Sequence, residues 1–187
     1  MLVIGVAMLQ GARHEHIHSL ILSAKELDLE ISIRELRKES DVDGIQGLVL
    51  PGGESTAMKI AGKSENLYDK LWSYIKESKI PVLGTCAGAI LLSQKELIAT
   101  EIQRNAFGRQ IDSFESKLRL NFENQENFNG IFIRAPRFTG EVKSAIAWLG
   151  DEVVGVKENN IIALTFHPEL SEDLLFHKWL INKANQY

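Results

Sequence analysis

The sequence predicts an α/β fold in which a mostly parallel sheet lies between two layers of helices. The first half of the chain alternates between short apolar segments and longer segments with helical spacing. The short segments are apolar at nearly every position, which is typical of strands covered on both faces. Small and polar residues follow several of these strands, at the edge where parallel sheets bind their ligands.

Composition and charge restrict the class of protein. The 187 residues suffice for a substantial core, and we expect residues 1–187 to form a single domain. A net charge of −4 offers no basic surface for nucleic acid, and no apolar run approaches the roughly 20 residues that span a bilayer. A single cysteine excludes an internal disulfide and fits a reducing cytoplasm. We therefore expect a cytoplasmic protein that binds neither nucleic acid nor membranes.

Seven elements are predicted before residue 97, in the order strand, helix, strand, strand, helix, strand, helix. The strands are residues 2–9, 30–36, 47–50 and the apolar run before Cys86, and the helices include residues 14–29, a segment with Leu67, Leu71, Trp72 and Ile75, and the segment from Cys86 to residue 97. Parallel strands end at one edge of the sheet. Gln10, Gly52–Gly53 and Cys86 should therefore converge there.

Three histidines alternate at the start of the first helix. On a strand His14, His16 and His18 would share a face and suggest a metal site, but on a helix His16 points away from the other two. We predict that they are solvent-exposed or helix-capping residues and that the chain binds no metal.

The second half is predicted to hold short strands and one closing helix. The strands are residues 101–107, 117–122, 130–134, 144–149, 152–157 and 161–166, with a hairpin turn at 158–160. The helix is predicted to begin near Ser171, with that residue as N-cap, and its apolar face carries Leu174, Leu175, Trp179 and Leu180.

The only cysteine lies in a tight turn between a strand and a helix. Gly84 and Gly88 flank Cys86 and allow a sharp bend, and the N-terminus of a helix favours the thiolate form of a cysteine. The turn thus favours a nucleophile, although a lone cysteine is more often a small buried apolar residue.

Partners for such a thiol occur at the ends of two other strands. His167 and Glu169 are two residues apart around Pro168, so on an extended segment the imidazole and carboxylate would share a side, as a general base requires. The alternative is a solvated Glu169 in a loop before the last helix. Gly52–Gly53 could form an anion-binding nest, or a plain turn before a helix capped by Ser55 or Thr56. The residues alone leave open whether Cys86 and His167 meet.

Several motifs together resemble a known family. Residues 84–88 with 167–169 resemble class I (triad) glutamine amidotransferases. Further blocks are similar to the glutaminase subunits of pyridoxal 5′-phosphate synthase, namely residues 9–12, 15–18, 50–56, 104–110, 112–115, 132–136 and 166–170. The segment between residues 97 and 104 is shorter than the family pattern.

The resemblance implies a flavodoxin-like class I glutamine amidotransferase fold and hydrolysis of L-glutamine to glutamate and ammonia through a γ-glutamyl thioester. The ammonia would pass to the synthase subunit (PdxS/SNZ type) in a large hetero-oligomeric complex that makes pyridoxal 5′-phosphate, the active form of vitamin B6. It implies neither a cofactor nor a metal in this chain.

The resemblance also implies roles for individual residues. Cys86 would be the nucleophile of a triad with His167 and Glu169, and backbone N–H groups of Gly53 and Ala87 would form the oxyanion hole. Glutamine would be bound by Gly52, Gly53, Glu54, Ser55, Arg104, Ile133 and Arg134. For the two arginines, the alternative is a purely solubilising role.

Two other functions compete with this one. The chain could serve imidazole or purine synthesis as the glutaminase subunit of another pathway, a reading that residues 104–110 and 133–136 disfavour. It could also be a non-catalytic, redox-sensing binding protein on the same fold with Cys86 as sensor. A sensor needs only the thiol, so the presence of His167 and Glu169 disfavours that reading.

Overall fold

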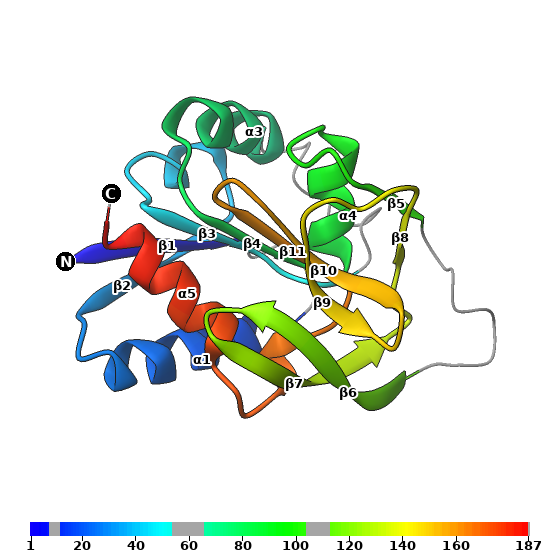
Figure 1. Cartoon of the computed structure of the whole chain (residues 1–187). Coiled ribbons are helices and arrows are strands. Elements are labelled where there is room, and N and C mark those ends of the chain that lie inside the picture. Colours follow the sequence, from blue (N-terminus) through cyan, green and yellow to red (C-terminus); the bar gives the residue numbers. More distant parts are fainter. Residues whose placement is uncertain (8–11, 54–65, 104–112, 187) are drawn as a thin grey trace.

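The computed structural model describes residues 1–7, 12–53, 66–103 and 113–186. A nine-stranded sheet runs through the molecule in the order β2-β1-β3-β4-β11-β10-β9-β6-β7 (Figure 1). The first five strands pair in parallel: β2 (Ile31–Leu36), β1 (Leu2–Ala7), β3 (Gly47–Leu50), β4 (Val82–Thr85) and β11 (Ile161–Leu164). The next four continue antiparallel: β10 (Glu152–Glu158), β9 (Ala145–Leu149), β6 (Ser113–Phe122) and β7 (Gln125–Ile133).

Helices cover both faces of the parallel strands (Figure 1). One face packs against α1 (Arg13–Glu26) and α5 (Leu175–Ala184), and the other packs against α3 (Leu67–Ser78) and α4 (Ala87–Gln94). Side chains alternate between the two cores along each strand. Leu83 joins the α1/α5 core, while its neighbour Val82 joins the α3/α4 core. Two 3₁₀ turns, η1 (Glu39–Asp41) and η2 (Pro168–Leu170), complete the helical elements of the described residues.

The predicted α/β fold is confirmed, and the order of elements in the first half matches the prediction. The strand predicted at 2–9 is described to Ala7, and the one predicted at 101–107 is β5 (Glu101–Gln103), because the remainder of each lies outside the described residues. β5 pairs with β8 (Arg137–Thr139), a three-residue strand that was not predicted. No helix in the described part of the chain has the length and apolar character needed to cross a membrane.

The closing helix begins later than predicted. It starts at Leu175, and Ser171 is therefore not its N-cap. The Ser171 hydroxyl accepts a hydrogen bond from the Asp173 amide, and the Asp173 carboxylate accepts one from the Leu175 amide. Side chains that bond nearby amides stabilise turns as well as helix starts, which explains the wrong boundary.

The sharp turn at Cys86 depends on close packing of α4 against the sheet. A Cβ atom built on Gly88 would overlap the carbonyl oxygen of Leu50 in β3, and one on Gly84 would overlap the end of the Leu92 side chain. Only glycine lets the helix approach the strand this closely at residue 88, since a backbone carbonyl cannot turn aside as a side chain can.

We predict that Gly88→Ala lowers the free energy of unfolding by about 1–3 kcal/mol or more, because the added methyl group pushes α4 away from β3. Urea denaturation measures the change. Ser93→Ala, which alters a partly exposed position near the end of the same helix, is the control and should stay within about 0.5 kcal/mol of wild type. An equal, small change in both variants would contradict the close-packing argument.

Candidate active site

Cys86 occupies a strained turn between β4 and α4. Its backbone has φ 48° and ψ −106°, a conformation that residues with a side chain rarely adopt. Two hydrogen bonds hold it there: the Cys86 amide donates to Leu164 O in β11 (2.8 Å), and the Ile90 amide donates to Cys86 O (3.2 Å). This arrangement places the thiol just beyond the strand end at the first turn of a helix, the position that a nucleophile occupies in known strand–turn–helix sites.

His167 and Glu169 follow β11 and contact each other, although not as predicted. The segment is not extended, because the 3₁₀ turn η2 begins at Pro168 and folds the Glu169 carboxylate back toward the imidazole. His167 Nδ1 lies 2.7 Å from Glu169 Oε1. An ionised carboxylate only accepts hydrogen bonds, so Nδ1 carries the proton and donates it. The imidazole of His167 and the carboxylate of Glu169 therefore meet because the chain turns between them, and not because both point to one side of an extended segment.

The structure also brings the cysteine to the histidine. The Cys86 side chain is among the groups that raise the pKa of His167, so the thiol and the imidazole interact directly. Gly52 lies against both, since a Cβ atom there would be 2.6 Å from His167 Cε1 and 3.2 Å from Cys86 Cβ. Cys86, His167 and Glu169 are all buried and form one continuous chain of polar contacts.

The charges of this group reinforce each other. Burial alone would lower the pKa of His167, but hydrogen bonds to Cys86 and Glu169 prevail and raise it to about 10. Burial alone would raise the pKa of Glu169, but the imidazoles of His16 and His167 prevail and lower it. The site thus holds an imidazolium beside a carboxylate at neutral pH.

The other residues predicted to lie at the site fall into three groups. Gly53, with φ 144°, directly follows Gly52, the residue that lies against Cys86 and His167. Ala87 is the first residue of α4, where the N–H groups have no partner within the helix. Ile133 and Arg134 have exposed side chains at the end of β7, beside Ile131, whose carbonyl accepts a hydrogen bond from the His167 amide (2.8 Å). Gln10, Glu54, Ser55 and Arg104 lie outside the described residues.

The prediction for the three histidines is right for two of them and wrong for the third. His14 and His18 are exposed on α1, whereas His16 is fully buried and contacts the Glu169 carboxylate. His177 on α5 is also fully buried and contacts His16, a role that the sequence reasoning missed. Both lie on the apolar faces of their helices: His16 is four residues before Leu20, and His177 is three before Leu180. That spacing was the available signal.

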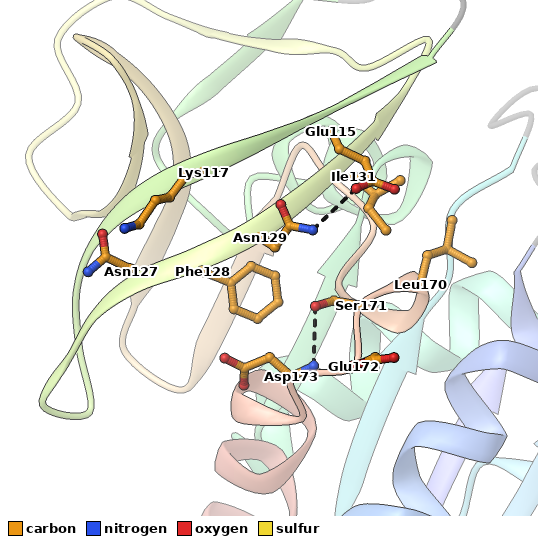
Figure 2. A pocket seen from close by; sticks show the side chains of 10 residues that line it. All are labelled: Glu115, Lys117, Asn127, Phe128, Asn129, Ile131, Leu170, Ser171, Glu172 and Asp173. Carbon is orange, nitrogen blue, oxygen red and sulfur yellow. Dashed lines mark hydrogen bonds between the residues drawn. The ribbon is translucent and has the colours of Figure 1, made fainter.

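A surface groove of about 640 Å³ lies beside the site, between the β6–β7 hairpin and the segment that joins η2 to α5 (Figure 2). Phe128 forms part of its apolar wall, and Glu115 accepts a hydrogen bond from Asn129. None of Cys86, His167 and Glu169 lines it. The groove is therefore separate from the polar chain described above.

Comparison with known proteins identifies the relatives of this chain. Residues 6–186 match the SNO glutamine amidotransferase family. Proteins named pyridoxal 5′-phosphate synthase subunit PdxT are 40% identical in Thermococcus onnurineus (98% of this chain, 100% of the relative), 41% in Thermosipho africanus (98% and 99%) and 34% in Nitrosopumilus maritimus (98% and 97%).

Two solved structures extend the comparison. A crystal structure described as a glutamine amidotransferase is 34% identical with a TM-score of 0.83, covering 97% of this chain and 98% of that one. The structure of PurLQS from Thermotoga maritima is 17% identical with a TM-score of 0.71, covering 100% and 98%, and shows a shared fold alone.

We predict that the buried histidines make the fold sensitive to acid. Burial lowers the pKa of His177 to about 3 from the ordinary 6.5 and lowers that of His16 in the same direction, so below pH 6.5 the unfolded chain binds more protons than the folded chain. The free energy of unfolding should fall as pH falls from 6.5 toward 3, by up to about 1.4 kcal/mol per pH unit for each group.

Urea denaturation at pH 7.5, 6.0 and 5.0 measures this dependence. His177→Leu should be less stable than wild type at pH 7.5 because His16 loses its partner, but should lose less stability on acidification. His18→Gln, on the exposed side of α1, is the control and should follow wild type. Parallel curves for wild type and His177→Leu would contradict the prediction.

His167 acts in the opposite pH range: its raised pKa contributes stability below pH 6.5 that is lost as pH rises through about 10.

Proposed function

The chain belongs to the SNO glutamine amidotransferase family, and from this premise we propose that it is the glutaminase subunit of a pyridoxal 5′-phosphate synthase, with Cys86, His167 and Glu169 as its catalytic triad. One observation carries the proposal. A thiol on a strained strand–helix turn contacts an imidazole that is hydrogen-bonded to a buried carboxylate, in a chain that matches the family over nearly its whole length.

The first half of the reaction forms a thioester. The Cys86 thiolate attacks the side-chain amide carbon of glutamine, and the carbonyl electrons move onto oxygen. The N–H groups of Gly53 and Ala87 stabilise this oxyanion, a type of contact whose loss typically lowers kcat by ~10²–10³-fold. When the tetrahedral intermediate collapses, the C–N bond breaks and His167 donates its proton to the leaving nitrogen. Ammonia departs and a γ-glutamyl thioester remains on Cys86.

The second half hydrolyses the thioester. His167, now neutral, removes a proton from a water molecule, and the hydroxide adds to the thioester carbon. Collapse of the second intermediate breaks the C–S bond, releases glutamate and restores the thiolate with a protonated His167. Glu169 keeps the proton on His167 Nδ1 throughout, so that the other ring nitrogen faces the reacting atoms, and it stabilises the imidazolium.

Residues around the triad are proposed to hold the glutamine. The Gly52–Gly53 loop with Glu54 and Ser55 would hold the amide end, since Gly52 lies against both Cys86 and His167. Arg104, Ile133 and Arg134 would hold the amino-acid end, where a guanidinium can bind an α-carboxylate with two parallel hydrogen bonds. Support for the second group comes from Ile131, which lies two residues before Ile133 in β7. The carbonyl oxygen of Ile131 accepts a hydrogen bond from the His167 amide, so the end of β7 lies close to His167.

The product ammonia explains the need for a partner. Free ammonia is protonated in water and becomes a poor nucleophile, so we propose that it passes directly to a synthase subunit bound in a large hetero-oligomeric complex. The proposed assignment treats residues 1–187 as one glutaminase domain. Because the nucleophile is a thiol that must stay reduced, we also propose that the reaction takes place in the cytoplasm.

The rival functions have weaker support. A subunit of purine synthesis would be expected to resemble PurLQS in sequence, yet the identity is 17%, compared with 34–41% for the PdxT proteins. A redox-sensing thiol is solvent-accessible, whereas Cys86 is buried. Protection of Cys86 from alkylation by glutamine would separate an enzyme from a sensor.

We predict that this protein releases glutamate from glutamine when the synthase subunit is present, and that Cys86→Ala lowers kcat by at least ~10³-fold, because no other group can form the thioester. An enzyme-coupled assay of glutamate release tests both statements. His14→Ala, which removes an exposed side chain from α1, is the matched control and should keep wild-type activity.

The outcomes divide clearly. Release that requires the synthase subunit and disappears in Cys86→Ala supports the triad and the pathway together. Release that ignores the partner but needs Cys86 supports a glutaminase and argues against the vitamin B6 assignment. Unchanged release in Cys86→Ala would refute the role of the nucleophile.

A further inference from the structure

Behind the triad lies a buried polar cluster of four residues from four separate elements. His16 comes from α1, Thr85 from the end of β4, Glu169 from η2 and His177 from α5. His16, Thr85 and His177 have no exposed surface, and Glu169 is 5% exposed. Polar side chains are costly in a protein core unless they are paired, so a cluster of this kind calls for an explanation beyond packing.

His16 stands at the centre of the cluster. Its Nε2 atom lies 3.1 Å from Thr85 Oγ1 and 3.3 Å from Glu169 Oε2, and its Nδ1 atom lies 2.9 Å from His177 Nε2. The other carboxylate oxygen, Glu169 Oε1, bonds His167 at 2.7 Å. The two oxygens of Glu169 therefore face one imidazole each, with the catalytic His167 on one side and His16 on the other.

The surroundings determine which nitrogen of His16 carries the proton. If Nε2 were bare, its lone pair would face the carboxylate oxygen at 3.3 Å, and the proton would lie on Nδ1 and point at His177 Nε2. His177 would then hold its own proton on Nδ1, which has no hydrogen-bond partner among the described residues, and a buried donor would be left unpaired. The opposite arrangement avoids both problems and leaves His177 Nδ1 only as an unpaired acceptor. His177 Nε2–H donates to His16 Nδ1, and His16 Nε2–H donates to Thr85 Oγ1 while Nε2 lies 3.3 Å from Glu169 Oε2. That carboxylate oxygen has no hydrogen-bond partner among the described residues, so its contact with His16 is electrostatic.

Both histidines act as neutral groups at neutral pH. Burial lowers the pKa of His16, and burial lowers that of His177 to about 3. A neutral N–H donor orients a carboxylate without cancelling its charge. The full negative charge of Glu169 thus remains available to His167.

We propose that His16 is a positioning residue for the glutaminase reaction: its Nε2–H group fixes the Glu169 carboxylate against His167, and His177 fixes the tautomer of His16. This inference rests on the proposed function. It links the catalytic carboxylate to α1 and α5, two helices that contribute no residue to the triad. An imidazole that orients a carboxylate has the same logic as the outer partners that orient metal-bound histidines.

Substitutions at residue 16 separate the position of the donor from simple filling of space. The side-chain amide nitrogen of glutamine lies near the place of histidine Nε2, whereas that of asparagine lies near the place of Nδ1. His16→Gln can therefore keep a donor toward Glu169, His16→Asn moves it toward His177, and His16→Leu removes it. His18→Gln on the exposed side of the same helix is the matched control.

Steady-state glutaminase kinetics with the synthase subunit give the first readout. His16→Leu and His16→Asn should lower kcat by about 10–100-fold with little change in the KM for glutamine, because the substrate contacts are intact while the imidazolium loses its fixed partner. His16→Gln should retain kcat within a few-fold of wild type. Equal losses in the Gln and Asn variants at wild-type thermal stability, or wild-type kcat in His16→Leu, would overturn the proposal.

Proton NMR of the full chain without substrate gives a second readout that does not depend on activity. The His167 Nδ1 proton, in a 2.7 Å hydrogen bond to Glu169, should resonate far downfield. The signal should persist in His16→Gln and shift upfield or broaden in His16→Asn and His16→Leu. An unchanged signal in all three variants would overturn the positioning role. Absence of glutaminase activity in the wild-type protein would refute the proposed function instead, and the NMR comparison would still test the contact.

If His16→Leu fails to fold, the comparison of His16→Gln with His16→Asn decides the matter, since both introduce an amide of similar polarity. A further variant, His177→Gln, keeps a donor amide facing His16 and should preserve both the downfield signal and kcat. Loss of both in a folded His177→Gln protein would overturn the assigned tautomer chain.

Discussion

The close contact between α4 and β3 is the constraint on which the rest of the site depends. Gly88 lets the helix backbone approach the Leu50 carbonyl, and Cys86, two residues earlier, makes its positive-φ turn between the strand and this closely packed helix. The turn in turn fixes three things at once: the thiol beyond the strand end, the Ala87 amide at the free end of a helix, and the contact of Gly52 with both Cys86 and His167. Strain at Cys86 is tolerated because the sheet and helix on either side hold it in place.

Electrostatic contacts stabilise the buried side chains that the backbone brings together. The Cys86, His167 and Glu169 side chains are buried, so their interactions are strong, and unpaired charge there would be costly. Each of these polar groups has a polar neighbour, in a series of contacts that runs from the thiol through His167 and Glu169 to His16 and His177. Charge is confined to His167 and Glu169, while the outer histidines stay neutral.

Much of this arrangement could be predicted from the sequence, and the exceptions have physical reasons. The pattern of apolar residues located the parallel strands and the helices. A strand buried on both faces is apolar at nearly every position, and a helix buried on one face has apolar residues every three or four positions. The start of α5 was placed at Ser171 because a serine that bonds a nearby amide looks the same in a turn and at a helix start. The spacing of His167 and Glu169 predicted their contact, but an unforeseen 3₁₀ turn produces it.

The outer histidines show the limit of local patterns most clearly. His16 and His177 are 161 residues apart, and only the packing of α1 against α5 brings them together. Their spacing from apolar residues of the same helices could have indicated burial, although His16 was predicted to be exposed or helix-capping. No local pattern indicated that they would meet a carboxylate. The outer part of the site is therefore a product of tertiary structure, whereas the cysteine turn is visible in the residues themselves.

Chemical trapping of the nucleophile tests the central claim most directly. A chloroketone analogue of glutamine, incubated with the complex of this chain and the synthase subunit, should form one covalent adduct that mass spectrometry locates on Cys86. An excess of glutamine should slow the labelling, and Cys86→Ser should abolish it. An adduct on another residue, or labelling of Cys86 that glutamine does not slow, would contradict the account.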